Sequence, residues 1–284
     1  MAGEQNAFES GFVKQTHPVQ TYIVDEQRNK LAWREDNFTD SWSNPETVVM
    51  IHGLAESGEA FRAWVPYLSR RFRVIRLDLR GYGYSSPMPE NYKWSMNKII
   101  TDMLVVLDHL KIRQANFVGG KIGGTIGLAL TAQYPERVKR LAAIGSPVSL
   151  VSLKENTIIW RRQIAEVGVE AWVRETQQNR MGTAMAPLQL EWWTQLMSQT
   201  AASTLLGFLQ MVPTIDISDM LASIKSPCLI VTSSGSSLNS VEQVRSWQQR
   251  IPGSRLLVID SASYHVGASH ADVVAAAVRD FLVA

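Results

Sequence analysis

The feature that most constrains this chain is a cluster of glycines between two apolar segments. Residues 115–118 form a short, mostly apolar run, residues 119–124 read Gly-Gly-Lys-Ile-Gly-Gly, and residues 125–132 form a second, helix-like apolar run. Glycine is favoured where the chain turns tightly, because every other residue places a Cβ in that space. The cluster therefore predicts a strand, a tight turn and a helix, with the side chain of Lys121 held on the turn above a sheet.

Strand-like and helix-like segments alternate on both sides of this cluster. An uninterrupted apolar run such as residues 47–51 is typical of a strand that is buried on both faces of a parallel sheet. Further strands are predicted at residues 21–24, 31–34, 73–78, 138–144, 227–232 and 255–259, and helices at residues 61–72, 96–110, 240–250 and 271–282. The first two of these strands would pair as a hairpin. This alternation predicts right-handed βαβ crossovers and a doubly wound, mostly parallel sheet of the α/β class.

The alternation stops after Pro147 and returns near Pro227. Between them the pattern is helical throughout, and this part of the chain is rich in tryptophan and methionine. We interpret residues 150–221 as an inserted helical cap, and residues 1–149 and 222–284 as the α/β core.

Composition excludes several classes of partner. A net charge of +2 without runs of like charge argues against nucleic acid, and no apolar stretch is long enough to span a membrane. Residues 1–15 are polar, unlike a signal peptide, and the single cysteine, Cys228, lies in an apolar run. We therefore expect a cytoplasmic protein, monomeric or homodimeric, with no metal ion and no cofactor.

Four segments, in this order, resemble the α/β-hydrolase superfamily. His52-Gly53 resembles the oxyanion loop of that family, and residues 78–85 resemble its D-x-R-G-x-G-x-S segment. Residues 119–124 resemble its nucleophile elbow, and His265 lies between the last strand and the last helix, where the family carries its catalytic histidine. The resemblance covers nearly the whole chain and implies an α/β-hydrolase fold with a helical cap.

The site departs from the family in two places. The elbow carries Lys121 where the family has its nucleophile, and neither loop that holds the family's triad acid, residues 145–148 or 233–240, contains a carboxylate. A standard Ser-His-Asp esterase is therefore excluded. The resemblance still implies an oxyanion hole at the backbone amides of Leu54 and Ile122.

Lys121 has three chemical roles open to it. Burial would lower the pKa of the amine, and without a neighbouring carboxylate the lysine would be neutral near pH 7. A neutral lysine can form a Schiff base or act as a general base, whereas a cationic one can bind a carboxylate or stabilise an enolate. All three roles favour a small-molecule substrate that carries a carbonyl or a carboxylate.

Other residues complete the predicted site. His265 would move protons, with Asp260 or a serine of residues 233–237 to orient it. The predicted pocket residues are His52, Glu56, Tyr82, Tyr84, Ser146, Trp192, Trp193 and Ser236. For His52 the alternative is a brace within its loop, and for Glu56 and the tyrosines a structural role.

We expect an enzyme that acts beside a carbonyl, with Lys121 as amine nucleophile or base. The reaction would be C–C cleavage, decarboxylation, cyclisation or hydrolysis of a hydrophobic or aromatic keto or ester substrate. Two alternatives place no reactive amine in the site. The chain is then either a catalytically inactive hydrolase homologue that binds a small ligand, with the lysine an inert remnant, or a serine enzyme into which the lysine was engineered.

Overall fold

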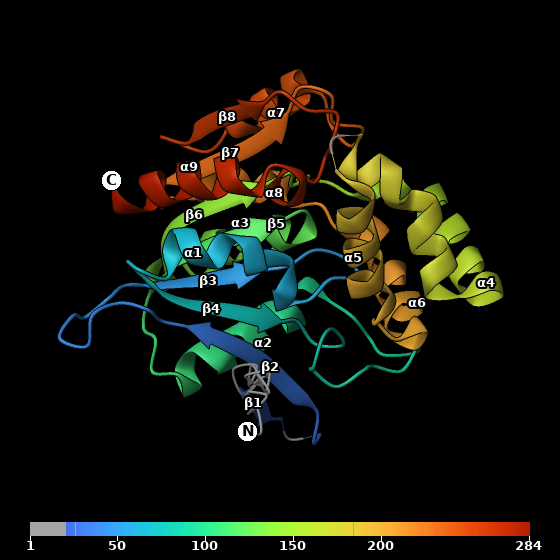
Figure 1. The fold of residues 1–284 in the computed structure, drawn as a ribbon, viewed down its shortest axis with the longest axis horizontal. Coiled ribbons are helices and arrows are strands. Elements are labelled where there is room, and N and C mark those ends of the chain that lie inside the picture. Colours follow the sequence, from blue (N-terminus) through green and yellow to red (C-terminus); the bar gives the residue numbers. More distant parts are fainter. Residues whose placement is uncertain (1–20, 26, 184) are drawn as a thin grey trace, which may run out of the picture.

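A computed structural model describes residues 21–25, 27–183 and 185–284. The polar segment at residues 1–15 lies outside these ranges. In the described part, eight strands form one sheet in the order β1-β2-β4-β3-β5-β6-β7-β8 (Figure 1). The strands are β1 (Thr21–Val24), β2 (Lys30–Asp36), β3 (Thr47–Ile51), β4 (Arg73–Asp78), β5 (Ala115–Gly120), β6 (Val138–Ile144), β7 (Cys228–Ser233) and β8 (Arg255–Ile259). Strands β1 and β2 pair antiparallel at one edge, and the pairs from β4 to β8 are parallel, which confirms the predicted sheet.

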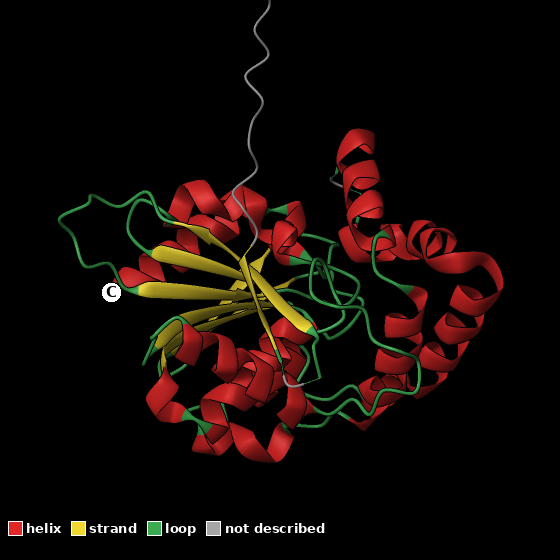
Figure 2. Cartoon of the chain, turned by 90° about the horizontal axis from the view of Figure 1, so that it is seen from below, coloured by secondary structure: helices red, strands yellow, loops and turns green. Residues whose placement is uncertain are grey.

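Helices cover both faces of the sheet. They are α1 (Val65–Leu68), α2 (Met96–His109), α3 (Ile122–Gln133), α4 (Lys154–Met181), α5 (Pro187–Ser198), α6 (Ala202–Met211), α7 (Val241–Gln248), α8 (Val266–Ser269) and α9 (Ala271–Val283), with the 3₁₀-helix η1 (Gly58–Trp64) before α1. Figure 2 shows the strands between two layers of helices. None of the helices in the described part is both long enough and apolar enough to cross a membrane.

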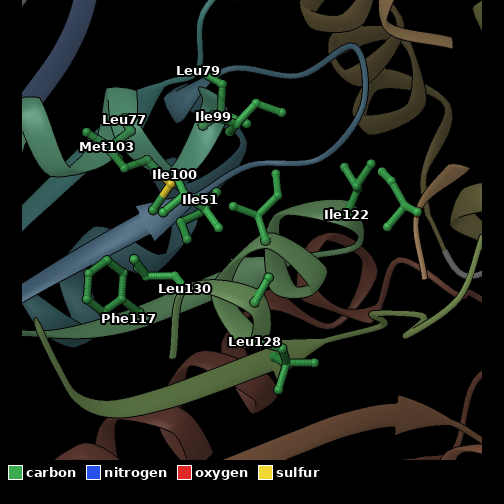
Figure 3. Packing of buried hydrophobic residues seen from close by; sticks show 14 of the residues in the cluster. Ile51, Leu77, Leu79, Ile99, Ile100, Met103, Phe117, Ile122, Leu128 and Leu130 are labelled. Atoms are coloured by element: carbon green, nitrogen blue, oxygen red, sulfur yellow. The ribbon is translucent and has the colours of Figure 1, made fainter. Parts of the chain in front are cut away.

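Successive side chains of the central strands enter two different cores, because side chains alternate across a strand. Val49 and Ile51 of β3 pack with α2 and α3, whereas Val48 and Met50 pack with α1 and α9. Figure 3 shows the first of these cores, where Ile99, Ile100 and Met103 from α2 gather close to Leu77 and Ile51. The uninterrupted apolar runs in the sequence follow from this double burial.

One predicted helix is wrong in type and extent. The pattern at residues 61–72 predicts a single helix, but the chain forms the 3₁₀-helix η1 followed by the one-turn helix α1. Pro66 lies at the start of α1 and has no N–H to donate to the preceding turn, so a continuous α-helix cannot run through it.

The helices α4, α5 and α6 lie together beyond one end of the sheet, beside the ends of the strands that carry the elbow and the loop after β3 (Figures 1 and 2). The two chain segments that connect them to the sheet pair with each other. Leu150 N–H donates to the Ile215 carbonyl at 2.9 Å, and Ile217 N–H donates to the Val148 carbonyl at 2.9 Å. The helical segment therefore leaves and rejoins the α/β core at one place.

Candidate active site

The turn between β5 and α3 is a strained elbow centred on Lys121. The backbone of Lys121 has φ 53° and ψ −124°, a combination that non-glycine residues rarely adopt. Its N–H donates to the Ile144 carbonyl at 2.8 Å. A Cβ on Gly119 would lie 2.5 Å from the Gly123 carbonyl oxygen, and a Cβ on Gly123 would lie 2.2 Å from the Ile51 carbonyl oxygen. These glycines let the helix pack close enough to the sheet to hold the turn.

Lys121 is 6% exposed, and its Nζ contacts Glu56 Oε1. Glu56 lies in the loop after β3, where its Oε2 accepts a hydrogen bond from Gly53 N–H at 2.9 Å. The lysine reaches the carboxylate across Gly53, since a Cβ at that position would lie 2.4 Å from Lys121 Cε. The elbow and the loop after β3 are therefore joined by a buried ion pair.

His265 shares the same carboxylate oxygen. Its Nε2 lies 2.8 Å from Glu56 Oε1, and its ring lies edge-on to Trp193 at 5.1 Å between centroids. The sequence patterns predict Asp260 or a serine of residues 233–237 as the partner of this ring. In the structure Asp260 accepts a hydrogen bond from Ser234 Oγ at 2.8 Å instead. The carboxylate of this site thus comes from the loop after β3, and from neither of the two loops, residues 145–148 and 233–240, that hold the family's triad acid.

Burial and charge set the protonation of the three groups. Burial alone would raise the pKa of Glu56, but the charge of Lys121 and the hydrogen bonds from His265 and Lys121 hold it well below its usual range. Burial lowers the pKa of Lys121 and Arg180 lowers it further, whereas Glu56 opposes the fall. Burial and the charge of Lys121 also lower the pKa of His265. One carboxylate oxygen therefore contacts both the amine of Lys121 and the ring of His265, a carboxylate that the prediction of a neutral lysine did not include, and this contact opposes the loss of the lysine proton.

A cavity of about 70 Å³ opens beside Lys121. Mostly apolar side chains line it, among them Trp160 and Trp172 of α4, and the polar lining groups are those of Lys121, Arg180 and Tyr264. Glu56 contacts the lysine, and His265 contacts Glu56, but neither residue lines the cavity.

Two of the residues predicted for the oxyanion hole border the cavity. Leu54 follows Gly53 in the loop after β3, and Ile122 is the first residue of α3. The amide of a first helical residue has no acceptor within its own helix, and the positive end of the α3 dipole lies at the same place. A developing negative charge next to Lys121 would therefore meet a positive potential.

His52 and Tyr82 lie beneath the site. Leu79 N–H donates to His52 Nε2 at 3.0 Å, and His52 Nδ1 lies 2.8 Å from the Gly53 carbonyl oxygen. The Tyr82 ring packs edge-on to that imidazole at 5.3 Å. Both side chains hold the loop after β3 in place and lie outside the cavity lining.

The remaining predicted pocket residues are not brought into the cavity. Tyr84 is 63% exposed and stacks against Arg34, and the Ser146 hydroxyl donates to the Ile144 carbonyl at 3.2 Å. Ser236 Oγ accepts from the backbone of its own loop. Trp192 and Trp193 line a separate surface groove beside α8.

Arg180 and Tyr264 line the cavity but escape the sequence patterns. Arg180 is 5% exposed and lies over the Trp172 ring at 4.8 Å. An arginine in a polar helical stretch gives no local sign of burial, since only the packing of α4 against the core decides it. Tyr264 is the neighbour of His265, so the histidine motif is the one signal that points to it.

The described residues contain no group of three or more His, Cys, Asp or Glu side chains that could hold a metal ion. Cys228 is buried, and burial raises the pKa of its thiol to about 12. It is therefore neither a nucleophile nor a metal ligand at neutral pH.

A family model described as the alpha/beta hydrolase fold matches residues 46–183. Bifunctional epoxide hydrolase 2 of Sus scrofa is 36% identical over 112 residues, which is 39% of this chain and 20% of that protein. The 2-hydroxymuconate semialdehyde hydrolase of Pseudomonas sp. strain CF600 is 39% identical over 102 residues, which is 35% of this chain and 36% of that protein. The matched regions thus span about a fifth and about a third of these relatives.

Solved structures agree over much more of the chain. The enol-lactonase from Burkholderia xenovorans LB400 superimposes with a TM-score of 0.84 and 24% identity, over 93% of this chain and all of that one. An esterase from Thermogutta terrifontis superimposes with a TM-score of 0.82 and 20% identity over 93% of this chain. At these identities the likeness concerns the fold.

Proposed function

Because this chain has the α/β-hydrolase fold, we propose that it is an atypical enzyme of that fold, which acts beside the carbonyl group of a small hydrophobic or aromatic substrate. The observation that carries the proposal is the position of Lys121. Its amine occupies the place of the family's nucleophile, faces an apolar cavity, and is flanked by the residues whose amides would form the oxyanion hole. The curated relatives named above are hydrolases of small molecules, which supports the same class.

Glu56 favours the cationic role for Lys121. A carboxylate in contact with an amine stabilises the ammonium, so a Schiff base would first require a proton to leave an ion pair. The sequence favours an amine nucleophile or base, and the structure turns our proposal toward electrostatic catalysis. The Lys121 ammonium and the amides of Leu54 and Ile122 would stabilise the negative charge that develops on the carbonyl oxygen when the neighbouring bond breaks and its electron pair passes into the enolate.

His265 acts through Glu56 in this proposal. Its Nε2 is engaged by the carboxylate, and the ring does not line the cavity, so it has no direct path to a substrate atom. We assign it a positioning role, in which it holds Glu56 against Lys121. The apolar walls, with two tryptophans from the cap that we place at residues 150–221, suit a flat or hydrophobic keto or ester substrate.

The test is turnover of a panel of aromatic keto acids, diketones and enol esters by wild type and Lys121→Met. We expect the variant to lose about 10²–10³-fold in kcat/KM, the usual effect of removing one oxyanion donor. Lys139→Met is the matched control, because Lys139 forms an exposed ion pair with Glu46 far from the cavity. Borohydride added during turnover should leave no adduct on Lys121. A borohydride adduct on Lys121 would instead show that the lysine forms a Schiff base with the substrate.

One observation favours a second function, that of a catalytically inactive homologue that binds a small ligand. Glu56 engages both Lys121 and His265, so each potential reactive group already has a protein partner. Under this alternative wild type turns over none of the panel, and Lys121→Met changes only ligand affinity.

A further inference from the structure

Arg180 is a buried guanidinium with no carboxylate partner among the described residues. The residue is 5% exposed, and the groups that contact its side chain are the Trp172 ring, the Tyr264 side chain and Gln177 Oε1, which lies 3.4 Å from Nη1. By contrast, the buried arginines Arg76 and Arg80 each form ion pairs with aspartates, with N–O distances of 2.6–2.8 Å. Arginine stays protonated in proteins, so Arg180 carries its charge without a carboxylate of the described residues in contact with it, and Glu56 acts on it only from a distance.

The cavity therefore holds an excess of positive charge. Lys121 and Arg180 both line it, and the carboxylate that contacts the lysine, Glu56, lies outside the lining. With His265 neutral, two cations face one carboxylate in a region that water reaches poorly. A buried charge without a partner is costly, and an anion from a ligand would remove that cost.

From this geometry we propose that Arg180 binds the carboxylate of the substrate, and that the ligand class of this cavity is a monoanionic acid with an aromatic or other apolar body. The guanidinium offers two parallel N–H donors to a carboxylate, and the Trp160 and Trp172 rings offer apolar surface for the body. This inference deepens the proposed function and rests on it for the identity of the cavity as a substrate site, but binding can be measured without turnover.

The cap position of Arg180 adds a consequence for specificity. The residue lies at the end of α4, whereas Lys121 lies on the core elbow, so an acid held by Arg180 would bridge cap and core. A neutral analogue of the same shape would fill the cavity but leave the guanidinium unpaired. Recognition of the acid over its ester should therefore depend on this one side chain.

The experiment is calorimetric titration with phenylpyruvate and with its methyl ester as probes. We expect wild type to bind the acid at least about tenfold more tightly than the ester, as charged hydrogen bonds usually provide. Arg180→Gln should lose about tenfold to a hundredfold in affinity for the acid and less than about twofold for the ester. Arg180→Lys should retain part of the preference. Arg162→Gln, on the exposed side of the same helix, is the matched control and should bind both probes as wild type does.

Equal affinity of wild type for acid and ester, or binding of neither probe, would overturn the inference, and neither comparison needs a variant to fold. A parallel loss of both probes in Arg180→Gln would show a packing role against Trp172. If acid preference depends on Arg180 while no substrate turns over in wild type, this inference stands and the proposed enzyme function fails. If turnover depends on Lys121 but wild type does not prefer the acid, the proposed enzyme function stands and this inference fails.

Discussion

At the residue scale, Gly53 decides how closely Lys121 can approach the loop after β3. The lysine stem runs over the space that a Cβ would fill, and Glu56 Oε2 lies 3.0 Å from the same point. The backbone of Gly53 does not have a positive φ, so the glycine is required by the neighbouring side chains and not by its own conformation. Gly53 thus leaves the space that the Lys121 side chain occupies.

Gly53→Ala should therefore destabilise the fold through Lys121. We expect a cost of about 1–3 kcal/mol in the free energy of unfolding, as for other overpacked sites. In a Lys121→Ala background the same change should cost at least about 1 kcal/mol less, because the Cε atom that it strikes is gone. Urea unfolding of the four proteins measures this difference. Gly120→Ala, whose Cβ would meet only Phe61 Cζ at 3.7 Å, is the control, and strictly additive effects would contradict the prediction.

At the element scale, the long helix α4 is two helical pieces joined at Gly168. That residue has φ 85° and ψ 170°, a region that only glycine occupies readily, and a Cβ there would meet no atom within 4 Å. The break redirects the helix so that its second piece carries Trp172 and Arg180 to the cavity. The course of α4 therefore depends on backbone conformation at one glycine.

Gly168→Ala should destabilise α4 without altering its side-chain packing, because a Cβ there meets no atom within 4 Å. The expected cost is about 1–3 kcal/mol, from backbone strain alone. Hydrogen exchange should quicken in α4 and stay unchanged in β3, β5 and β6. Val167→Ala, at the exposed neighbouring position, should show neither effect. If hydrogen exchange in α4 rises equally in both variants, the backbone conformation of Gly168 does not determine the stability of α4.

At the scale of the whole molecule, two buried neutral histidines tie stability to pH. Burial lowers the pKa of His52 and of His265 below 6.5, and for His265 the charge of Lys121 adds to the fall. The unfolded chain therefore binds protons at both positions that the folded chain does not. Their contribution is complete above about pH 6.5 and is lost as the pH falls, at up to about 1.4 kcal/mol per pH unit for each ring.

His265→Gln should reduce this dependence. Between about pH 6.5 and pH 5 wild type should lose stability faster than the variant, by up to about 1.4 kcal/mol per pH unit. The free energy of unfolding in urea at several pH values measures both slopes. His109→Gln, which alters an exposed histidine of α2, should leave the wild-type slope unchanged. Parallel curves for wild type and His265→Gln would contradict the prediction.

How far the sequence predicts this molecule depends on the range of each interaction. The strands and the elbow follow from local patterns, since a doubly buried strand and a glycine turn both leave their mark within a few residues. The contact between Glu56 and His265 joins positions 209 residues apart and has no local mark. In the sequence, Arg180 likewise cannot be told from an exposed arginine of a polar helix, because only the packing of α4 buries it. The fold could therefore be predicted from the sequence, whereas the charge pairing in the site could be seen only in the structure.

The shared carboxylate also limits what a serine at position 121 could do. Lys121→Ser would place a hydroxyl on the elbow, yet it would leave Glu56 buried without its lysine partner and still bound to His265 Nε2, the nitrogen that a serine would need as base. A working Ser-His pair would therefore need at least two substitutions, one at Lys121 and one that frees His265 from Glu56. The three side chains thus form a unit that cannot be converted one residue at a time.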